Sequence, residues 1–321
     1  MLKRLATAAV AAVLLAAGPV AAQVAQLPAA LAEQGSRNIA VASRINARAS
    51  ELAASLDQRA VERATSVEAH VAAVDGMAPQ LTAARRELAA MHAELRTLPV
   101  LGGTDGPVQL RVIDHAIADS VAFLQRIDDM LAAYPEVADG FRSNDSGRAE
   151  RGLATLAAAT TTLVDGQALM MRSRAALLGS DRSDYAHAEG IACLYDGMAA
   201  ILRLQLGLVE SGPAAAAIQT AEVCVQQQIA SGRAALVRES ESRSDDPVAR
   251  ALEVRLAEIS IRIFDKMAEG GDILGDVVAV VRTGSAGAEL AAQMDRFIQF
   301  ERDLSALGDE QGRALIARTP G

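Results

Sequence analysis

The segment Ile191–Val209, IACLYDGMAAILRLQLGLV, decides the fold of this chain. Its large apolar side chains do not fit on one stripe of a helix and cover nearly the whole circumference. A helix that is apolar on all sides belongs in the middle of a bundle, where neighbouring helices cover every face. The segment therefore predicts an all-α protein with this helix at its centre.

Two charged residues, Asp196 and Arg203, interrupt this apolar helix. Their spacing puts them on the same side of the helix. A buried carboxylate has to be paired or neutralised, so one hypothesis is a polar pocket in the core. The alternative, which we favour, is a structural ion pair or a side chain that reaches solvent at the edge of the helix.

The rest of the chain is rich in Ala, Leu, Glu, Gln and Arg and shows no period-two alternation typical of strands. Short connections predict a mostly antiparallel helical bundle of about eight to ten helices. Either one elongated unit or two packed bundles, 23–140 and 141–321, would satisfy this pattern, with the boundary in a loop at 138–147. Within this plan, helix breaks are expected at Asp75–Gly76, before Pro135 and at Gly270–Gly271, and a capped helix start is expected at Asp246–Pro247.

The first 22 residues, MLKRLATAAVAAVLLAAGPVAA, have the three parts of a secretory signal peptide. Lys3 and Arg4 are the positive region, an uncharged apolar run follows, and small residues precede a cleavage site after Ala22. The apolar run is shorter than the roughly 20 residues of a spanning helix. We therefore expect a periplasmic or secreted protein, with no transmembrane segment after cleavage.

Charge and composition exclude several classes of partner. The formal net charge is −9, and all basic residues except Lys3 and Lys266 are arginines. Nucleic acids attract basic surfaces, and their single strands, like sugars, stack on aromatic rings. The chain has no Trp and only 2% aromatic residues. We therefore expect no nucleic-acid partner and no stacking platform.

The two cysteines, Cys193 and Cys224, are expected to pair in an oxidising compartment. The geometry depends on where the first of two antiparallel helices ends. A turn at 211–213 leaves an axial offset of roughly 10 Å, too far for a disulfide, whereas a helix that ends near Gly207 reduces the offset to about 4–5 Å. Two buried free thiols are the alternative.

The sequence contains none of the compact motifs of catalysis, haem attachment, zinc, calcium or nucleotide binding. We therefore expect no cofactor, no metal and no catalytic residue. A helical-bundle metal protein or enzyme remains as an alternative. It would use His115, His187, Asp184 or Asp196.

Arginine provides one pattern with helical spacing. Arg37, Arg44 and Arg48 lie within about 40° of each other on a helix, beside an apolar stripe. Such a row could bind an anion, above all across the interface of a homodimer. The alternative, which we favour, is a solvated flank paired with Glu33, Glu51 or acids of a neighbouring helix.

Two short stretches, SRNIAVASRI (Ser36–Ile45) and GQALMMRSRAALL (Gly166–Leu178), resemble a motif of periplasmic sensor domains. The family is that of type IV pilus chemotaxis transducers and nitrate sensors, and the resemblance covers these two stretches only. In the nitrate sensors the arginine of the motif meets the anion. The resemblance places Arg44 and Arg174 at that position.

Together these observations predict an exported, soluble helical-bundle protein that binds or interacts without catalysis. It would be a small-anion sensing module or would bind a protein partner. An envelope-associated scaffold is a further alternative, although Ala-rich helices supply little apolar surface for it. The candidate ligand-binding residues are Arg37, Arg44, Arg48, Arg174, Asp196 and Arg203.

Overall fold

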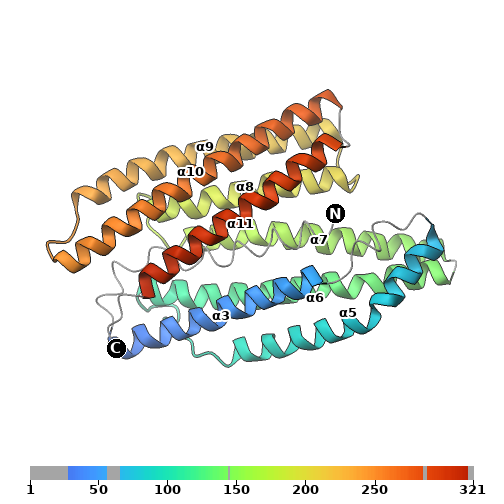
Figure 1. The fold of residues 1–321 in the computed structure, drawn as a ribbon, viewed down its shortest axis with the longest axis horizontal. Helices are drawn as coiled ribbons and strands as arrows, with labels where there is room; N and C mark the ends of the chain where they lie inside the picture. Colours follow the sequence, from blue (N-terminus) through green and yellow to red (C-terminus); the bar gives the residue numbers. More distant parts are fainter. Residues whose placement is uncertain (1–27, 56–65, 144, 285–287, 317–321) are drawn as a thin grey trace.

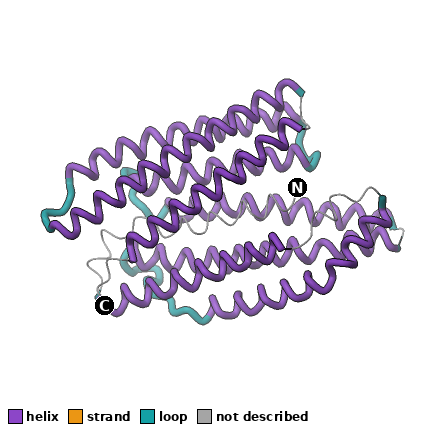
Figure 2. Tube along the Cα trace, viewed as in Figure 1, coloured by secondary structure: helices purple, strands orange, loops and turns teal. Residues whose placement is uncertain are grey.

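The computed structural model describes residues 28–55, 66–143, 145–284 and 288–316. Within these ranges every regular element is a helix and there is no strand, which confirms the all-α prediction (Figures 1 and 2). The eight helices are α3 (Ala29–Ser55), α5 (Val67–Arg96), α6 (Val108–Arg142), α7 (Ser146–Ala175), α8 (Ser183–Gln205), α9 (Ser211–Glu241), α10 (Pro247–Thr283) and α11 (Ala288–Ile316).

Consecutive helices run back and forth along the long axis of the molecule (Figure 1). From α5 onward each helix packs against the next one in the chain, and α3 packs mainly against α6. Helix α7 contacts both α6 and α8, so it joins the α3–α6 side of the molecule to the α9–α11 side. The division into 23–140 and 141–321 stays a prediction, and its boundary falls in the last turn of α6.

Helix α8 occupies the central position that its sequence predicts, but it ends at Gln205, so residues 206–209 of the predicted segment lie outside it and Leu208 is 55% exposed. Most of its residues are buried, because α7, α9 and α10 all pack against it. Glycines on its surface allow these close approaches: a Cβ atom at Gly197 would lie only 2.7 Å from a methyl carbon of Leu274 on α10. The apolar circumference of α8 is thus matched by helices on several faces.

The predicted break at Gly270–Gly271 is wrong, because α10 runs through it without interruption. Both glycines are buried, and a Cβ atom at Gly270 would lie 2.8 Å from the Phe300 ring and 2.9 Å from Leu194. The pair therefore serves close packing between helices, and tertiary contacts outweigh the low helix propensity of glycine.

The predicted breaks at Asp75–Gly76 and before Pro135 are also wrong. Helix α5 continues through Asp75, Gly76 and Pro79, and α6 continues through Pro135. In each case the buried apolar stripe carries on across the break, with Val74 and Met77 in α5. Burial of these side chains offsets the lost hydrogen bond of a proline. The loop expected at 138–147 is therefore largely helical, because α6 continues to Arg142 and α7 begins at Ser146.

The predicted start of a helix at Asp246–Pro247 is confirmed. Asp246 is the N-cap of α10 and accepts a hydrogen bond from the Val248 amide at 3.0 Å. Pro247 occupies the first turn, where its missing N–H leaves no bond unmade.

Cys193 of α8 and Cys224 of α9 form a disulfide, with their Cα atoms 6.0 Å apart. Helix α8 ends at Gln205, and Gly207 has a φ of 70°, the left-handed conformation that ends helices. Because α8 ends this early, the axial offset between the two cysteines is small enough for the bond. The sequence prediction of a Cys193–Cys224 pair is confirmed.

No helix in the described part of the chain is long and apolar enough to cross a membrane. The predicted signal peptide at 1–22 lies outside the described residues.

Candidate functional site

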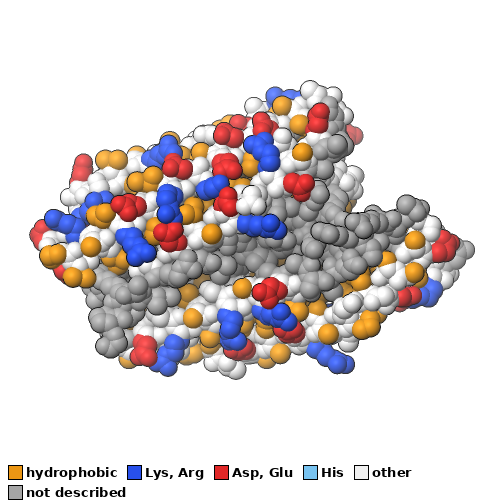
Figure 3. Space-filling view, viewed as in Figure 1, with side chains coloured by type: hydrophobic (Ala, Val, Ile, Leu, Met, Phe, Trp, Pro, Cys, Tyr) orange, Lys and Arg blue, Asp and Glu red, His pale blue; other side chains and the backbone are white. Residues whose placement is uncertain are grey.

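The predicted row of arginines on α3 is engaged in ion pairs. Arg37 pairs with Glu33 at 2.6 Å, Arg44 with Glu94 of α5 at 2.5 Å, and Arg48 with Glu87 of α5 at 2.6 Å and Glu51 at 3.0 Å. All three arginines are exposed. These contacts correspond to the solvated, paired flank that was the alternative to an anion site. The visible face of the molecule likewise mixes basic and acidic side chains instead of gathering one sign (Figure 3).

Asp196 and Arg203 do not meet each other. Asp196 forms an ion pair with Arg172 of α7, and Arg203 forms one with Asp165 of α7 at 2.5 Å. The four side chains are 41–44% exposed, so these pairs lie at the edge of the α7–α8 contact. This is the structural arrangement that the sequence favoured over a polar pocket in the core.

Arg174 is the one predicted binding arginine in the interior. Only 6% of it is exposed, and it interacts electrostatically with Asp119 of α6 and Asp184 of α8. Burial lowers the pKa of Arg174 to about 10, although both carboxylates counteract this. The guanidinium therefore keeps its charge at neutral pH and is already matched by acidic groups.

The pKa values of the acidic neighbours of Arg174 are raised. Burial raises the pKa of Asp119 to about 7 and that of Asp184 to about 6. Burial also lowers the pKa of His187 to about 3, so this imidazole is neutral. The structure thus brings together His187, Asp184, Asp119 and Arg174, with His115 one turn before Asp119 on α6.

The residues named for a metal site are not assembled into one. Asp196 belongs to the ion pair with Arg172, and the positive charge of Arg174 lies beside Asp184 and His187, where it opposes a cation. In the described part of the chain, no group of three or more His, Cys, Asp or Glu side chains has an arrangement that could hold a metal ion.

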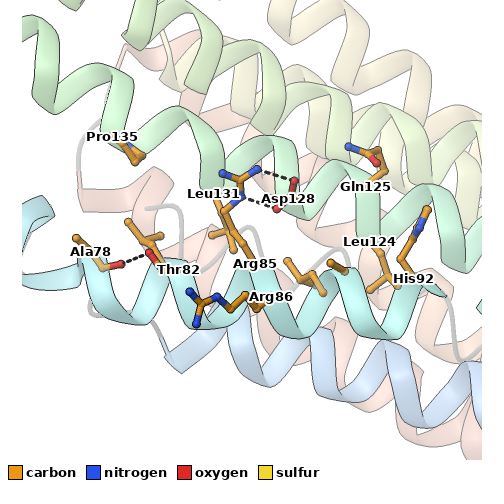
Figure 4. A pocket seen from close by; sticks show the side chains of 13 residues that line it. Ala78, Thr82, Arg85, Arg86, His92, Leu124, Gln125, Asp128, Leu131 and Pro135 are labelled. Carbon is orange, nitrogen blue, oxygen red and sulfur yellow. Dashed lines mark hydrogen bonds and ion pairs between the residues drawn. The ribbon is translucent and has the colours of Figure 1, made fainter. Parts of the chain in front are cut away.

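An open groove of about 540 Å³ lies between α5 and α6 (Figure 4). This volume is within the range of small-molecule sites, roughly 300–1,000 Å³. Its walls are apolar, and the larger side chains are Leu81 and Leu88 from α5 and Leu124 and Leu131 from α6. These leucines are only 0–3% exposed, so they form the floor beneath the groove and present little surface themselves.

The polar groups of the groove carry a positive excess. Arg85 reaches across from α5 to Asp128 of α6 and donates two hydrogen bonds, at 2.6 and 2.9 Å (Figure 4). Arg86 also lines the groove but points away from that pair, and it has no ion-pair partner among the described residues. His92 lines the groove one to two turns further along α5. The lining of the groove therefore contains two arginines and one aspartate, in a chain whose net charge is −9.

Sequence reasoning missed this groove. Arg85 and Arg86 lie in a stretch, LTAARRELAAMHAEL (Leu81–Leu95), that reads as an ordinary amphipathic helix. The signal that could have found the groove is the pair of adjacent arginines. Adjacent residues point to different sides of a helix, so an acid on one neighbouring helix can pair with only one of them. The partner helix α6 and the groove between them come only from the tertiary structure.

Comparison with protein-family models, with curated proteins and with solved structures gives no match. The candidate site therefore rests on its own geometry and charge.

Proposed function

We propose that this protein is an exported, non-catalytic helical-bundle module that binds a small anionic molecule in the α5–α6 groove. The observation that carries the proposal is the positive rim of Arg85 and Arg86 beside apolar walls. A ligand with a short apolar body and one carboxylate or similar anion fits this combination. The apolar part would lie on the apolar walls and the anion would meet the arginines.

Arg86 is the side chain that a ligand anion would engage first, because no acidic side chain of the described residues holds it. Arg85 gives Asp128 two of its five N–H donors and keeps three for a second acceptor. An anion at Arg85 would share that guanidinium with Asp128, whereas Arg86 points away from the pair and offers its guanidinium without this competitor. The site would therefore bind a single negative charge better than two.

Export is supported by the Cys193–Cys224 disulfide, since such bonds persist in oxidising compartments. It is also supported by the signal-peptide pattern of residues 1–22. Binding without catalysis is supported by the groove itself, whose polar residues provide charge and hydrogen bonds but no pair of nucleophile and base.

The test is a thermal-shift and calorimetric titration of the mature protein with nitrate, acetate, butyrate and hexanoate. Ligand binding to the folded state raises the melting temperature. We expect the shift to increase from acetate to hexanoate, since each buried methylene contributes about 0.8 kcal/mol. Arg86→Gln should abolish the shift or weaken binding at least tenfold.

Arg44→Gln is the matched control. It removes an exposed arginine of the neighbouring helix α3 that is paired with Glu94 outside the groove. Binding that persists in Arg44→Gln and is lost in Arg86→Gln supports the groove. Binding that is lost in Arg44→Gln and kept in Arg86→Gln, or no binding of any of these anions, contradicts the proposal.

A further inference from the structure

Helix α7 separates α6 from α8, which make few contacts with each other. Arg174, near the end of α7, is the link between them, because its buried charge interacts with Asp119 of α6 and with Asp184 of α8. The three helices are thus joined at one place by charged groups in addition to their apolar contacts.

Helices α6, α7, α8 and α9 contribute titratable or charged groups at this place, and α10 contributes an aromatic ring. Helix α6 contributes His115, Asp119 and Arg126, and α7 contributes Arg174. Asp184 and His187 come from α8, and Arg182 immediately precedes that helix. Glu239 comes from α9, and from α10 the Phe264 ring contacts the edge of His187. We call these groups the Arg174 cluster.

The cluster also holds the start of α8. The Ser183 amide and hydroxyl donate to the Glu239 carboxylate at 3.0 and 2.7 Å. A carboxylate at a helix N-terminus satisfies free N–H groups and interacts favourably with the helix dipole. Arg182 pairs with Asp184 at 3.2 Å. Three arginines (126, 174, 182) and three acids (119, 184, 239) therefore balance when all are ionised.

We propose that the Arg174 cluster makes the junction of α6, α7 and α8 proton-sensitive, so that proton uptake by Asp119 tightens the junction and proton loss loosens it. Asp119 is largely removed from water, with its side chain 17% exposed. Its ionised form gains from Arg174 and Arg126, but the loss of hydration is the larger effect. A neutral Asp119 avoids that cost.

The sign of the effect follows from proton binding. The pKa of Asp119 is about 7 in the folded chain and about 4 in water, so the closed junction binds a proton that the opened junction releases. Stability from this group is full at acidic pH and is lost as the pH rises from about 4 to 7. Asp184 acts in the same direction up to about pH 6.

The two histidines act in the opposite direction. Burial lowers the pKa of both, so they add stability as the pH rises to about 6.5 and change nothing above it. Below pH 6.5 the two effects offset each other. The contribution of Asp119 is therefore best seen by comparing the chain with a variant that lacks only this carboxyl.

The experiment measures amide hydrogen exchange of the segment 176–190 in the full-length mature protein between pH 6 and pH 8, corrected for intrinsic exchange. Relative to Asp119→Asn, which keeps the shape and cannot ionise, an opening that hydrates Asp119 should become about tenfold more frequent in the wild type over this range. The two histidines titrate in both chains, so their contribution cancels in this comparison. Asp129→Asn, an exposed carboxyl on the same helix that accepts from Gln125, should behave like the wild type.

The same pH dependence in Asp119→Asn as in the wild type overturns the proposal. A purely structural role for Asp119 would change exchange equally at every pH. If Asp119→Asn does not fold, Asp119→Ser removes the same carboxyl with a smaller neutral side chain. The same pH dependence in that variant as in the wild type also overturns the proposal.

Discussion

Removal of the Cys193–Cys224 disulfide should destabilise the protein by several kcal/mol. The perturbation is the double variant Cys193→Ala/Cys224→Ala. The bond closes a loop whose ends are 31 residues apart, which contains the α8–α9 turn. Fixing a loop of this length lowers the entropy of the unfolded chain by an amount worth about 3.7 kcal/mol at 25 °C.

Packing adds a smaller cost. Cys193 is 1% exposed and belongs to the core, so the loss of its sulfur should cost a further ~1 kcal/mol. Cys224 is only half-buried, and alanine should be tolerated there. The expected total is about 4–5 kcal/mol, a large fraction of the 5–15 kcal/mol that is typical of folded domains.

Urea unfolding followed by circular dichroism measures this effect in the oxidised wild type and in the double variant. Since both chains have the same folded structure, the helical signal without urea should be retained. The urea concentration at the midpoint of unfolding should fall in the double variant. A loss of less than ~1 kcal/mol would refute the reasoning, since it would mean that the unfolded chain already holds α8 and α9 together. Reduction of the wild type with a thiol should reproduce most of the loss.

Two further predictions concern single residues. Gly232→Ala places a Cβ atom in the buried Phe264 ring and should lower the free energy of unfolding by about 1–3 kcal/mol. Gly76→Ala, inside helix α5, meets nothing within 4 Å and should raise the free energy of unfolding by about 0.5–1 kcal/mol. The urea midpoints of the two variants check this, and equal effects would count against it. Burial raises the pKa of Glu301 well above its ordinary value, so the folded chain keeps this proton and loses stability as the pH rises. The melting temperature of Glu301→Gln should therefore rise relative to that of the wild type between pH 5 and pH 8. A difference in melting temperature that stays constant over this range would contradict the prediction.

The sequence predicted the fold correctly where the residue pattern of a single helix was sufficient. Helix α8 is apolar around its circumference, and that pattern alone places it among several neighbours. The disulfide was predictable only as a condition on where this helix ends. Gly207 meets that condition, because glycine adopts the left-handed conformation of a helix end without strain.

The sequence was misleading where local preference and tertiary contact disagree. Gly270 and Pro135 are helix breakers by propensity, yet both lie inside long helices. At Gly270 the neighbouring Phe300 and Leu194 leave no room for a side chain. A local pattern cannot reveal that a partner helix requires a small residue at a given turn.

Among the described residues the α3 arginines are paired and Arg86 of the groove is not, and this difference also depends on tertiary contacts that a local pattern does not reveal. Whether an arginine can bind a free anion depends on what already occupies its guanidinium, and for Arg44 that is Glu94, fifty residues further along the chain. A carboxylate held in place by the fold acts at an effective concentration of the order of millimolar or more, so a free anion at lower concentration does not displace it. Arg86 has no such competitor among the described residues and stands beside apolar walls that add binding energy. Anion recognition should therefore follow Arg86 instead of the arginine with the more suggestive sequence motif.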